Sequence, residues 1–386
     1  MAKFKVNKTY KDINKKIADG KVVVVTAEEI IGMVKKDGPI KTAQKVDVVT
    51  TGTFAPMCSS GVFINIGQSN PTIRTTKTWF NNVPAYSGLA AVDCYLGATQ
   101  TCDDDPLNKK YPGAFEYGGG HVIQDLVAGK KVTIRAESYG TDCYPNRRIE
   151  KVVTLKDLVN ATLCNPRNAY QNYNCAINKS DKIKYTYMGT LKPDMGNANY
   201  STSGELSPLF NDPYLKTIGL GTRIFLGGAQ GFVTWSGTQF KKEVDRTLDG
   251  VPLTPAATLF VTGDLKEMSP EWLVGQSIRG YGVSLSVGFG IPIPILNEEI
   301  VKYTAVSDKE IFTQVLDYAF DYQSGNSKSY GQVSYAELKS GTITIKGKKI
   351  PTVPLSSMVK ARKIADKLKT WIQKGKFFLG EPQKFF

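Results

Sequence analysis

The sequence predicts an α+β fold: a mixed sheet core with glycine-rich loops, capped helices and a C-terminal amphipathic helix. Three observations support it. Residues 21–50 have the pattern of a strand, a helix and a second strand. Strand patterns interrupted by glycines recur through 182–239, and helix-capping signals are spread along the chain. The sequence contains no internal repeat and no low-complexity linker, so we expect residues 1–386 to form a single domain.

The β-α-β signal of the first fifty residues is the clearest. The all-apolar run 22–25 predicts a buried strand, and Thr26 with Glu29 makes a capping box at the start of a helix that we expect Gly38 to close. A second apolar strand follows over 46–49. This order predicts a parallel strand pair.

The second strand leads into a loop that carries Cys58, in the segment TGTFAPMCSSG. Small residues and hydroxyls surround the thiol, and such donors lower a thiol's pKa and hold an anionic sulfur species. The alternative is a plain turn with an incidental buried cysteine.

Residues 118–145 give a second site-like pattern, GGGHVIQDLVAGKKVTIRAESYGTDCYP. Three glycines precede a helix expected over 121–128, a strand follows over 132–136, and Cys143 lies on the polar turn beyond it. Glycine-rich backbone before a helix suits an anion, although a plain glycine turn and a passenger cysteine explain the same residues. Because a cysteine follows a strand in both segments, the pattern favours a paired-thiol site of Cys58 and Cys143.

The remaining predicted elements surround these segments. We expect few strands in 62–117, a helix over 154–163 that places Cys164 at its C-terminal end, and another helix beginning at Ser269-Pro270-Glu271. We also expect an extended segment over 284–296, capping boxes at Ser307 with Glu310 and Ser334 with Glu337, and a final amphipathic helix over 358–374.

Composition excludes several classes of protein. The sequence has no apolar run long enough to span a membrane and no signal peptide, so we expect a cytoplasmic protein. It lacks the P-loop, the G-x-S-x-G elbow and the H-E-x-x-H motif, and it has one histidine. Six cysteines without a C-x-x-C pair are too few for a disulfide scaffold, and we expect no metal at the acidic run 103–105. An iron–sulfur cluster stays open as a minority alternative.

The net charge of +14 lies at the two ends of the chain. Residues 1–50 hold 11 lysines against 6 acidic residues, and 341–386 hold 11 basic residues against 2 acidic ones, so the middle is balanced. These lysines lack the interleaved aromatics of a nucleic-acid groove, so we expect no nucleic-acid partner. A solubilising surface is the first interpretation, and docking of an acidic protein such as a ferredoxin is the second.

Several long motifs together resemble the homocysteine biosynthesis family, the L-aspartate semialdehyde sulfurtransferases. They are VVTTGTFAPMCSSG, GGGHVIQDLVAGK, AESYGTDCYP, GNANYS, LSPLFNDP, IGLGTRIFLGGAQG, MSPEWL and GFGIPIPILNEE. The resemblance implies sulfur incorporation into aspartate semialdehyde to make homocysteine, through a cysteine persulfide. The two family cysteines fall on Cys58 and Cys143.

The resemblance implies the two cysteines, and the other expected roles are inferred from residue type. We expect Cys143 to carry the persulfide with Cys58 within exchange range, and His121 to act as a proton donor. The expected substrate-binding residues are Arg223, Arg135, Asp142 and Tyr139.

The resemblance also defines the expected partners. Family members in methanogens often carry C-terminal regulatory modules and work with a ferredoxin-containing partner, and this sequence shows neither module. We therefore expect an electron donor that is another protein or a thiol, and a sulfur source that is sulfide or a persulfide donor. The alternative function is an iron–sulfur or thiol carrier of sulfur or electrons without a small-molecule substrate.

Overall fold

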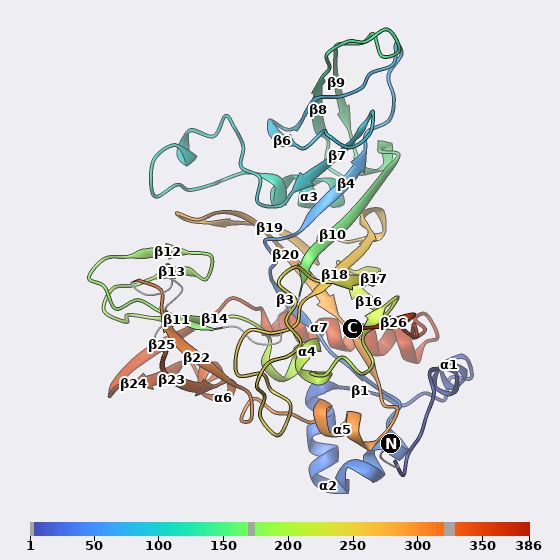
Figure 1. Cartoon of the computed structure of the whole chain (residues 1–386), viewed down its shortest axis with the longest axis vertical. Helices are drawn as coiled ribbons and strands as arrows, with labels where there is room; N and C mark the ends of the chain where they lie inside the picture. The colour runs from blue at the N-terminus through green and yellow to red at the C-terminus, as the bar shows by residue number, and fades with distance from the viewer. Residues whose placement is uncertain (1–3, 169–173, 320–328) are drawn as a thin grey trace.

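The computed structural model describes residues 4–168, 174–319 and 329–386, and these residues form an α+β fold (Figure 1). The predicted fold class is confirmed. The helices of the described residues are α1 (Tyr10–Ala18), α2 (Ala27–Lys45), α3 (Gly119–Val127), α4 (Pro208–Asn211), α5 (Glu298–Thr304), α6 (Tyr335–Lys339) and α7 (Met358–Gln373).

The central sheet has nine strands within the described ranges. Eight follow the order β19 (Leu273–Ile278), β20 (Gly282–Gly290), β16 (Arg223–Leu226), β17 (Ala229–Ser236), β18 (Leu259–Asp264), β10 (Asn160–Asn168), β4 (Gly61–Asn65) and β7 (Asp93–Gly97), and β3 (Thr53–Pro56) pairs with β20. Every residue of β20 is buried, as expected of a strand covered on both faces.

Smaller sheets flank it. A six-stranded sheet has the order β23 (Ser329–Ser334), β22 (Phe312–Asp317), β11 (Cys175–Ile177), β14 (Ala198–Tyr200), β25 (Lys348–Pro354) and β24 (Thr342–Ile345). A four-stranded sheet, here called the arm, has the order β6 (Val83–Ala85), β5 (Lys77–Phe80), β8 (Val132–Glu137) and β9 (Arg148–Val153) and stands at the top of Figure 1. The other strands are β1 (Val24–Thr26), β2 (Val48–Thr50) and β21 (Pro292–Pro294) in one sheet, the pair β12 (Lys184–Thr186) and β13 (Gly189–Leu191), and the pair β15 (Gly219–Leu220) and β26 (Lys384–Phe385).

The predicted parallel pair is confirmed by β1 and β2, with Val24 opposite Val48. The capping box of Thr26 and Glu29 also forms. The predicted end of this helix is wrong, because helical residues resume after a kink at Gly38, where φ is 75°, and continue to Lys45. The final helix is confirmed as α7, whose buried face packs on the central sheet: Ala361, Ile364, Ala365, Leu368 and Ile372.

Two predicted helices are wrong. The box of Thr154 and Asp157 forms but starts only the short 3₁₀ turn η2 (Leu155–Asp157), and the chain then enters β10. Since β10 pairs with β4 on one side and β18 on the other, strand pairing overrides the local helix signal there, and Cys164 lies in a strand. Residues 269–272 make a turn that buries Trp272 before β19.

The expectation of few strands in 62–117 is also wrong, because β4, β5, β6 and β7 lie wholly or largely there. The missed signal is Asn81-Asn82, whose positive φ angles of 47° and 64° join β5 to β6 in a tight hairpin. The segment over 284–296 is extended as predicted, in β20 and β21. The box of Ser334 and Glu337 caps α6, whereas the hydrogen bonds of Ser307 with Glu310 form without a helix.

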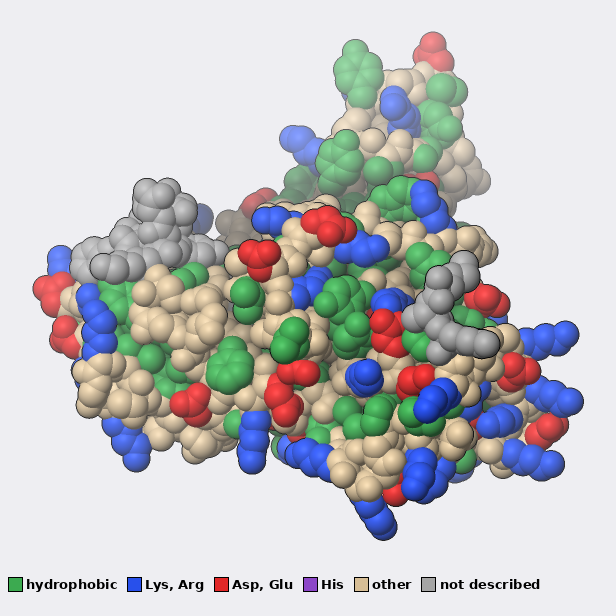
Figure 2. Space-filling model, turned by 60° about the horizontal axis from the view of Figure 1, so that its bottom comes forward, with side chains coloured by type: hydrophobic (Ala, Val, Ile, Leu, Met, Phe, Trp, Pro, Cys, Tyr) green, Lys and Arg blue, Asp and Glu red, His purple; other side chains and the backbone are tan. Residues whose placement is uncertain are grey.

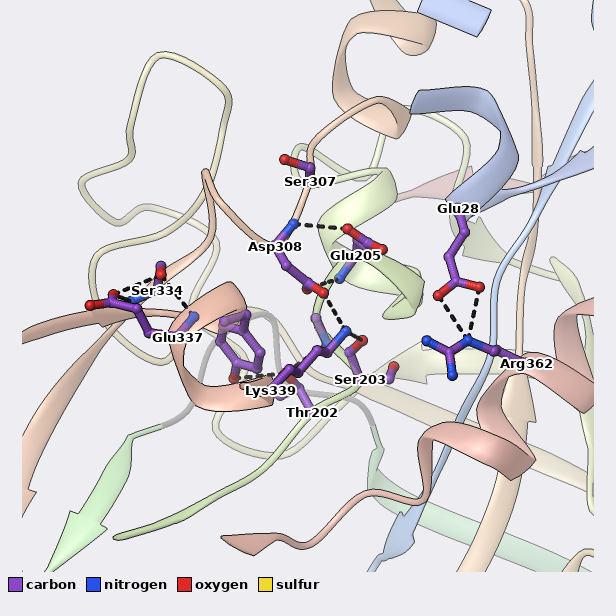
Figure 3. A network of polar contacts seen from close by, with 12 residues as sticks. Glu28, Thr202, Ser203, Glu205, Ser307, Asp308, Ser334, Glu337, Lys339 and Arg362 are labelled. Carbon is purple, nitrogen blue, oxygen red and sulfur yellow. Dashed lines mark hydrogen bonds and ion pairs between the residues drawn. The ribbon is translucent and has the colours of Figure 1, made fainter. Parts of the chain in front are cut away.

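A polar network fixes the segment that leads into α4 (Figure 3). The backbone N–H of Glu205 donates to Asp308 Oδ1 at 3.0 Å, and the backbone N–H of Asp308 donates to Glu205 Oε2 at 2.9 Å. Lys339 of α6 pairs with Asp308 Oδ2 at 2.5 Å and donates to the carbonyl of Ser203 at 3.1 Å. The network holds residues 202–207 between the six-stranded sheet and the rest of the protein.

Candidate functional site

A cavity of about 320 Å³ is lined by residues of the central sheet and by residues just beyond strands of the six-stranded sheet. Cys58 and its neighbours after β3 form one wall, and Thr202 with Ser207 from the segment held by the Figure 3 network lies on another. Ser356, just beyond β25, completes the side that the six-stranded sheet supplies. The cavity has the mixed apolar and polar lining of a small-molecule site.

Cys58 lies on the turn between β3 and β4. The N–H of Ser60 donates to the carbonyl of Met57 at 3.0 Å, which closes the turn, and the N–H of Met57 donates to the carbonyl of Leu285 at 2.8 Å, which ties it to β20. Cys58 Sγ lies 3.1 Å from the hydroxyl of the fully buried Ser284. The thiol is therefore held in a fixed position by the sheet.

Arg167 of β10 lines the same cavity and is connected to the Cys58 turn. The side-chain amide of Asn165 donates to Ser60 Oγ at 2.8 Å, and Asn165 Oδ1 accepts from the N–H of Arg167 at 2.9 Å. Arg167 Nη1 donates to Gln239 Oε1 at 2.8 Å. These contacts hold Arg167 in the lining of the cavity that Cys58 also lines.

The environment of Cys58 acts on its pKa in two directions. Burial raises the pKa of the thiol above its usual value, while the hydrogen bond with Ser284, the charge of Arg167 and a hydrogen bond with Tyr281 lower it. The net effect keeps the resting thiol protonated at neutral pH. The groups that lower the pKa are those that a sulfur anion formed in the cavity would use.

The structure places Cys143 elsewhere. It is exposed, on the loop that joins β8 to β9 in the arm, with Thr141 Oγ1 at 3.5 Å from its sulfur and its carbonyl accepting from Thr72 Oγ1 at 3.0 Å. Figure 1 shows this hairpin at the end of the molecule away from β3. The structure does not bring Cys143 and Cys58 together.

His121 lies on α3, which packs against β19 and β20, and is not part of the cavity lining. Its Nε2 lies 3.3 Å from Ser277 Oγ, its Nδ1 is buried without a hydrogen-bond partner, and its ring stacks on Tyr117 with centroids 5.6 Å apart. Burial lowers the pKa of the imidazole, and the charge of Asp125 opposes this. A catalytic role for His121 stays a prediction.

The three glycines at the start of α3, Gly118 to Gly120, serve close packing. A Cβ at Gly119 would lie 1.8 Å from the carbonyl oxygen of Gly97, and one at Gly120 would lie 2.0 Å from that of Ser284. The N–H groups of Gly119 and Gly120 donate to backbone carbonyls of Gln100 and Ala98. The interpretation as an anion-binding loop is therefore wrong at these two positions.

The other expected substrate-binding residues lie outside the cavity lining. Arg223 on β16 donates to the carbonyl of Phe378 at 3.4 Å, and Arg135 on β8 stacks over Trp79 at 4.6 Å. Asp142 and Tyr139 are exposed on the arm, close in sequence to Cys143. Their proposed roles stay predictions, and they do not share a site with Cys58.

The remaining cysteines are packed in the fold or lie away from the cavity. Cys94, Cys164 and Cys175 are buried, and burial raises their pKa values, to about 12, 11 and 12 respectively. Cys102 is half-buried, 3.7 Å from the carbonyl of Asn82. Within the described ranges, no group of three or more His, Cys, Asp or Glu residues is arranged to hold a metal ion.

Comparison with known proteins agrees with this chemistry. The family model described as "Homocysteine biosynthesis enzyme, sulfur-incorporation" matches residues 22–379. The chain belongs to this family. It is 52% identical to the L-aspartate semialdehyde sulfurtransferase of Methanosarcina acetivorans, over 98% of this chain and 71% of that protein. It is 45% identical to the L-aspartate semialdehyde sulfurtransferase of Methanocaldococcus jannaschii, over 97% of this chain and 72% of that protein.

More distant relatives and structures add little to the family assignment. An uncharacterized protein of Methanothermobacter thermautotrophicus is 28% identical over 88% of this chain and 74% of its own length. No solved structure gives a significant match. In the described residues, no helix has the length and apolarity needed to cross a membrane.

The sequence analysis did not identify four residues of the site. Arg167, Tyr281 and Ser356 line the cavity, and Ser284 contacts Cys58. None of the first three stands in a motif with Cys58, and Ser284 is 226 residues away along the chain. Only the pairing of β3 with β20 brings it to the thiol.

Proposed function

We propose that this protein incorporates sulfur into L-aspartate semialdehyde to form homocysteine, and that Cys58 carries the sulfur. The observation that supports this most directly is the position of Cys58 in the cavity wall, with Ser284 Oγ 3.1 Å from its sulfur and Arg167 in the same lining. Membership of the sulfur-incorporating family and the names of the two relatives support the reaction and the substrate. Cys143 is the less suitable carrier, because it is exposed and is not among the residues that line this cavity.

The chemistry starts from a persulfide on Cys58. Its terminal sulfur attacks the aldehyde carbon, and the carbonyl oxygen takes up protons and leaves as water. Conversion of an aldehyde and sulfide into a thiol and water consumes two electrons and two protons. When the sulfur arrives as a persulfide, cleavage of the S–S bond consumes two more of each and releases Cys58 as a thiol.

The reaction therefore needs a sulfur donor and an electron donor. We propose a persulfide donor, such as a protein persulfide, as the first, because sulfide could load Cys58 only with a two-electron oxidant. We propose a ferredoxin-type protein as the second. Figure 2 shows Lys and Arg side chains projecting from the edges of the face that forms the bottom of Figure 1, which suits an acidic partner. No step of this scheme requires a bound iron–sulfur cluster. The cytoplasmic location expected from the sequence stays a prediction.

The test uses the purified chain under anaerobic conditions with L-aspartate semialdehyde, a persulfide donor and a low-potential reductant. Wild-type protein is expected to form homocysteine, and treatment with a persulfide donor is expected to add the mass of one sulfur atom to the Cys58 peptide. Cys58→Ser is expected to abolish both results. Cys102→Ser is the matched control, since Cys102 is also half-buried but lies outside the cavity lining. Normal homocysteine formation by Cys58→Ser would exclude Cys58 as the carrier.

A further inference from the structure

The charge of the cavity is one-sided. Among the described residues that line it, Arg167 is the one charged side chain, and the other polar groups are hydroxyls and amides such as Ser356, Thr202 and Gln239. No described lining residue is an aspartate or a glutamate. The described part of the lining therefore favours a ligand with a negative charge, and an ammonium group meets no acidic side chain among these residues.

Arg167 is pre-oriented for such a ligand. Its backbone is fixed by Asn165, which is in turn bound to Ser60 of the Cys58 turn, and its side chain is fixed by Gln239. A guanidinium offers a rigid fork of N–H donors that matches the two oxygens of a carboxylate. Holding the arginine in place lowers the entropy cost of ligand binding.

Ser356 gives an independent sign of a ligand. The residue is 2% exposed and lines the cavity, and its hydroxyl oxygen makes no hydrogen bond. Its neighbours fix the backbone on both sides, because Leu355 N–H donates to the carbonyl of Tyr200 and Ser357 N–H donates to that of Phe54, both at 2.8 Å. A buried hydroxyl without a partner is unfavourable, so a ligand that supplies an acceptor recovers that loss.

We propose that Arg167 binds the carboxylate of the substrate, that Ser356 donates to an oxygen of the same ligand, and that the site selects short aldehydes by their carboxylate rather than their amine. The proposal rests on the proposed function, since it takes the reacting aldehyde to lie at Cys58. It extends the substrate class to four-carbon aldehyde acids that lack the amino group.

The first experiment compares three aldehydes with the wild-type protein. L-Aspartate semialdehyde carries both groups, succinate semialdehyde lacks the amine, and 3-aminopropanal lacks the carboxylate. We expect kcat/KM for succinate semialdehyde within about tenfold of that for L-aspartate semialdehyde, and a loss of about a hundredfold or more for 3-aminopropanal. The reverse order would overturn the proposal.

The second experiment measures binding without turnover. Butyrate keeps the carboxylate and the four-carbon chain, and its occupancy of the cavity is expected to slow alkylation of Cys58 by iodoacetamide, followed by mass spectrometry of the Cys58 peptide. Arg167→Met and Ser356→Ala are each expected to weaken this protection by about tenfold or more in butyrate concentration. Arg167→Lys keeps the charge without the fork and is expected to lie between Arg167→Met and wild type.

Arg223→Gln is the competing variant, because Arg223 is also a half-buried strand arginine but lies outside the cavity. The proposed subsite would be wrong if butyrate no longer protected Cys58 from alkylation in Arg223→Gln but still protected it fully in Arg167→Met and Ser356→Ala. The buried thiols of Cys94, Cys164 and Cys175 report on folding, since they stay unmodified in a folded variant. Failure of wild-type protein to use any of the aldehydes would count against the proposed function, whereas activity and protection that are independent of Arg167 and Ser356 would count against the subsite alone.

Discussion

Ser284→Ala tests whether the contact with Cys58 stabilises a sulfur anion. The two side chains lie 3.1 Å apart, and Ser284 is fully buried on β20, opposite Gln276 of β19. A hydrogen bond to a charged group contributes about 1.5–3 kcal/mol. Because the Ser284 hydroxyl lowers the pKa of Cys58 while burial raises it, its removal raises that pKa further. We expect alkylation of Cys58 at neutral pH to slow by about ten- to a hundredfold.

The assay follows iodoacetamide labelling of the Cys58 peptide as a function of pH. The Ser284→Ala profile is expected to shift to higher pH and to reach the wild-type rate once the thiol is fully ionised. Ser286→Ala is the matched control, because Ser286 is buried two residues further along the same strand, opposite Pro56 of β3, whereas the contact of Cys58 Sγ is with Ser284. Equal profiles for Ser284→Ala and wild type would show that the contact does not stabilise the thiolate.

Two further predictions concern stability. Asp47→Asn is expected to lower the free energy of unfolding by about 1–3 kcal/mol in urea titrations, because Asp47 is fully buried and accepts from Lys8, Lys16 and the N–H of Val23. Burial raises the pKa of Asp47, but the hydrogen bonds outweigh burial and hold this pKa below its usual value. The stabilisation is therefore present above the pKa of the unfolded chain, and it is lost as pH falls through the pKa of the folded protein. For Glu205, burial and then the charge of Asp308 raise the carboxyl pKa, so its contribution is lost as pH rises through the folded value. Glu205→Gln is therefore expected to unfold with a free energy that changes less than that of wild type as pH rises from about 4.3, the unfolded pKa of a glutamate, and an equal pH dependence would contradict this.

Local sequence signals predicted the elements whose stabilising contacts lie nearby in the chain. The box of Thr26 with Glu29 and the box of Ser334 with Glu337 each join residues three apart, and both form. The same kind of signal at Thr154 predicted a helix that does not form, because the contacts that decide β10 come from β4 and β18. Such pairing is set by residues roughly 100 positions away and leaves no local pattern.

The candidate site, too, was predicted only where the signal is local in the sequence. The loop of small and hydroxyl residues around Cys58 pointed to a position that does line the cavity. The paired-thiol interpretation used a similar pattern around Cys143, but a strand followed by a cysteine recurs in the arm without any relation to the cavity. Arg167 stands between a proline and an asparagine in the sequence, and only the fold reveals that it lines the same cavity as Cys58.

The separation of the two cysteines changes the electron balance of the proposed reaction. An internal disulfide would supply the electron pair that cleaves the persulfide, and it requires Cα atoms within about 7 Å. Cys58 is fixed to β20 through Met57 and Ser284, and Cys143 belongs to the arm, whose strands pair with one another and not with the central sheet. In this conformation, Cys143 of the same chain cannot form a disulfide with Cys58 and so cannot supply an electron pair. The pair that cleaves the persulfide and the pair that reduces the aldehyde carbon must therefore both come from outside the cavity. The requirement for an external reductant thus follows from the positions of the thiols as well as from the stoichiometry.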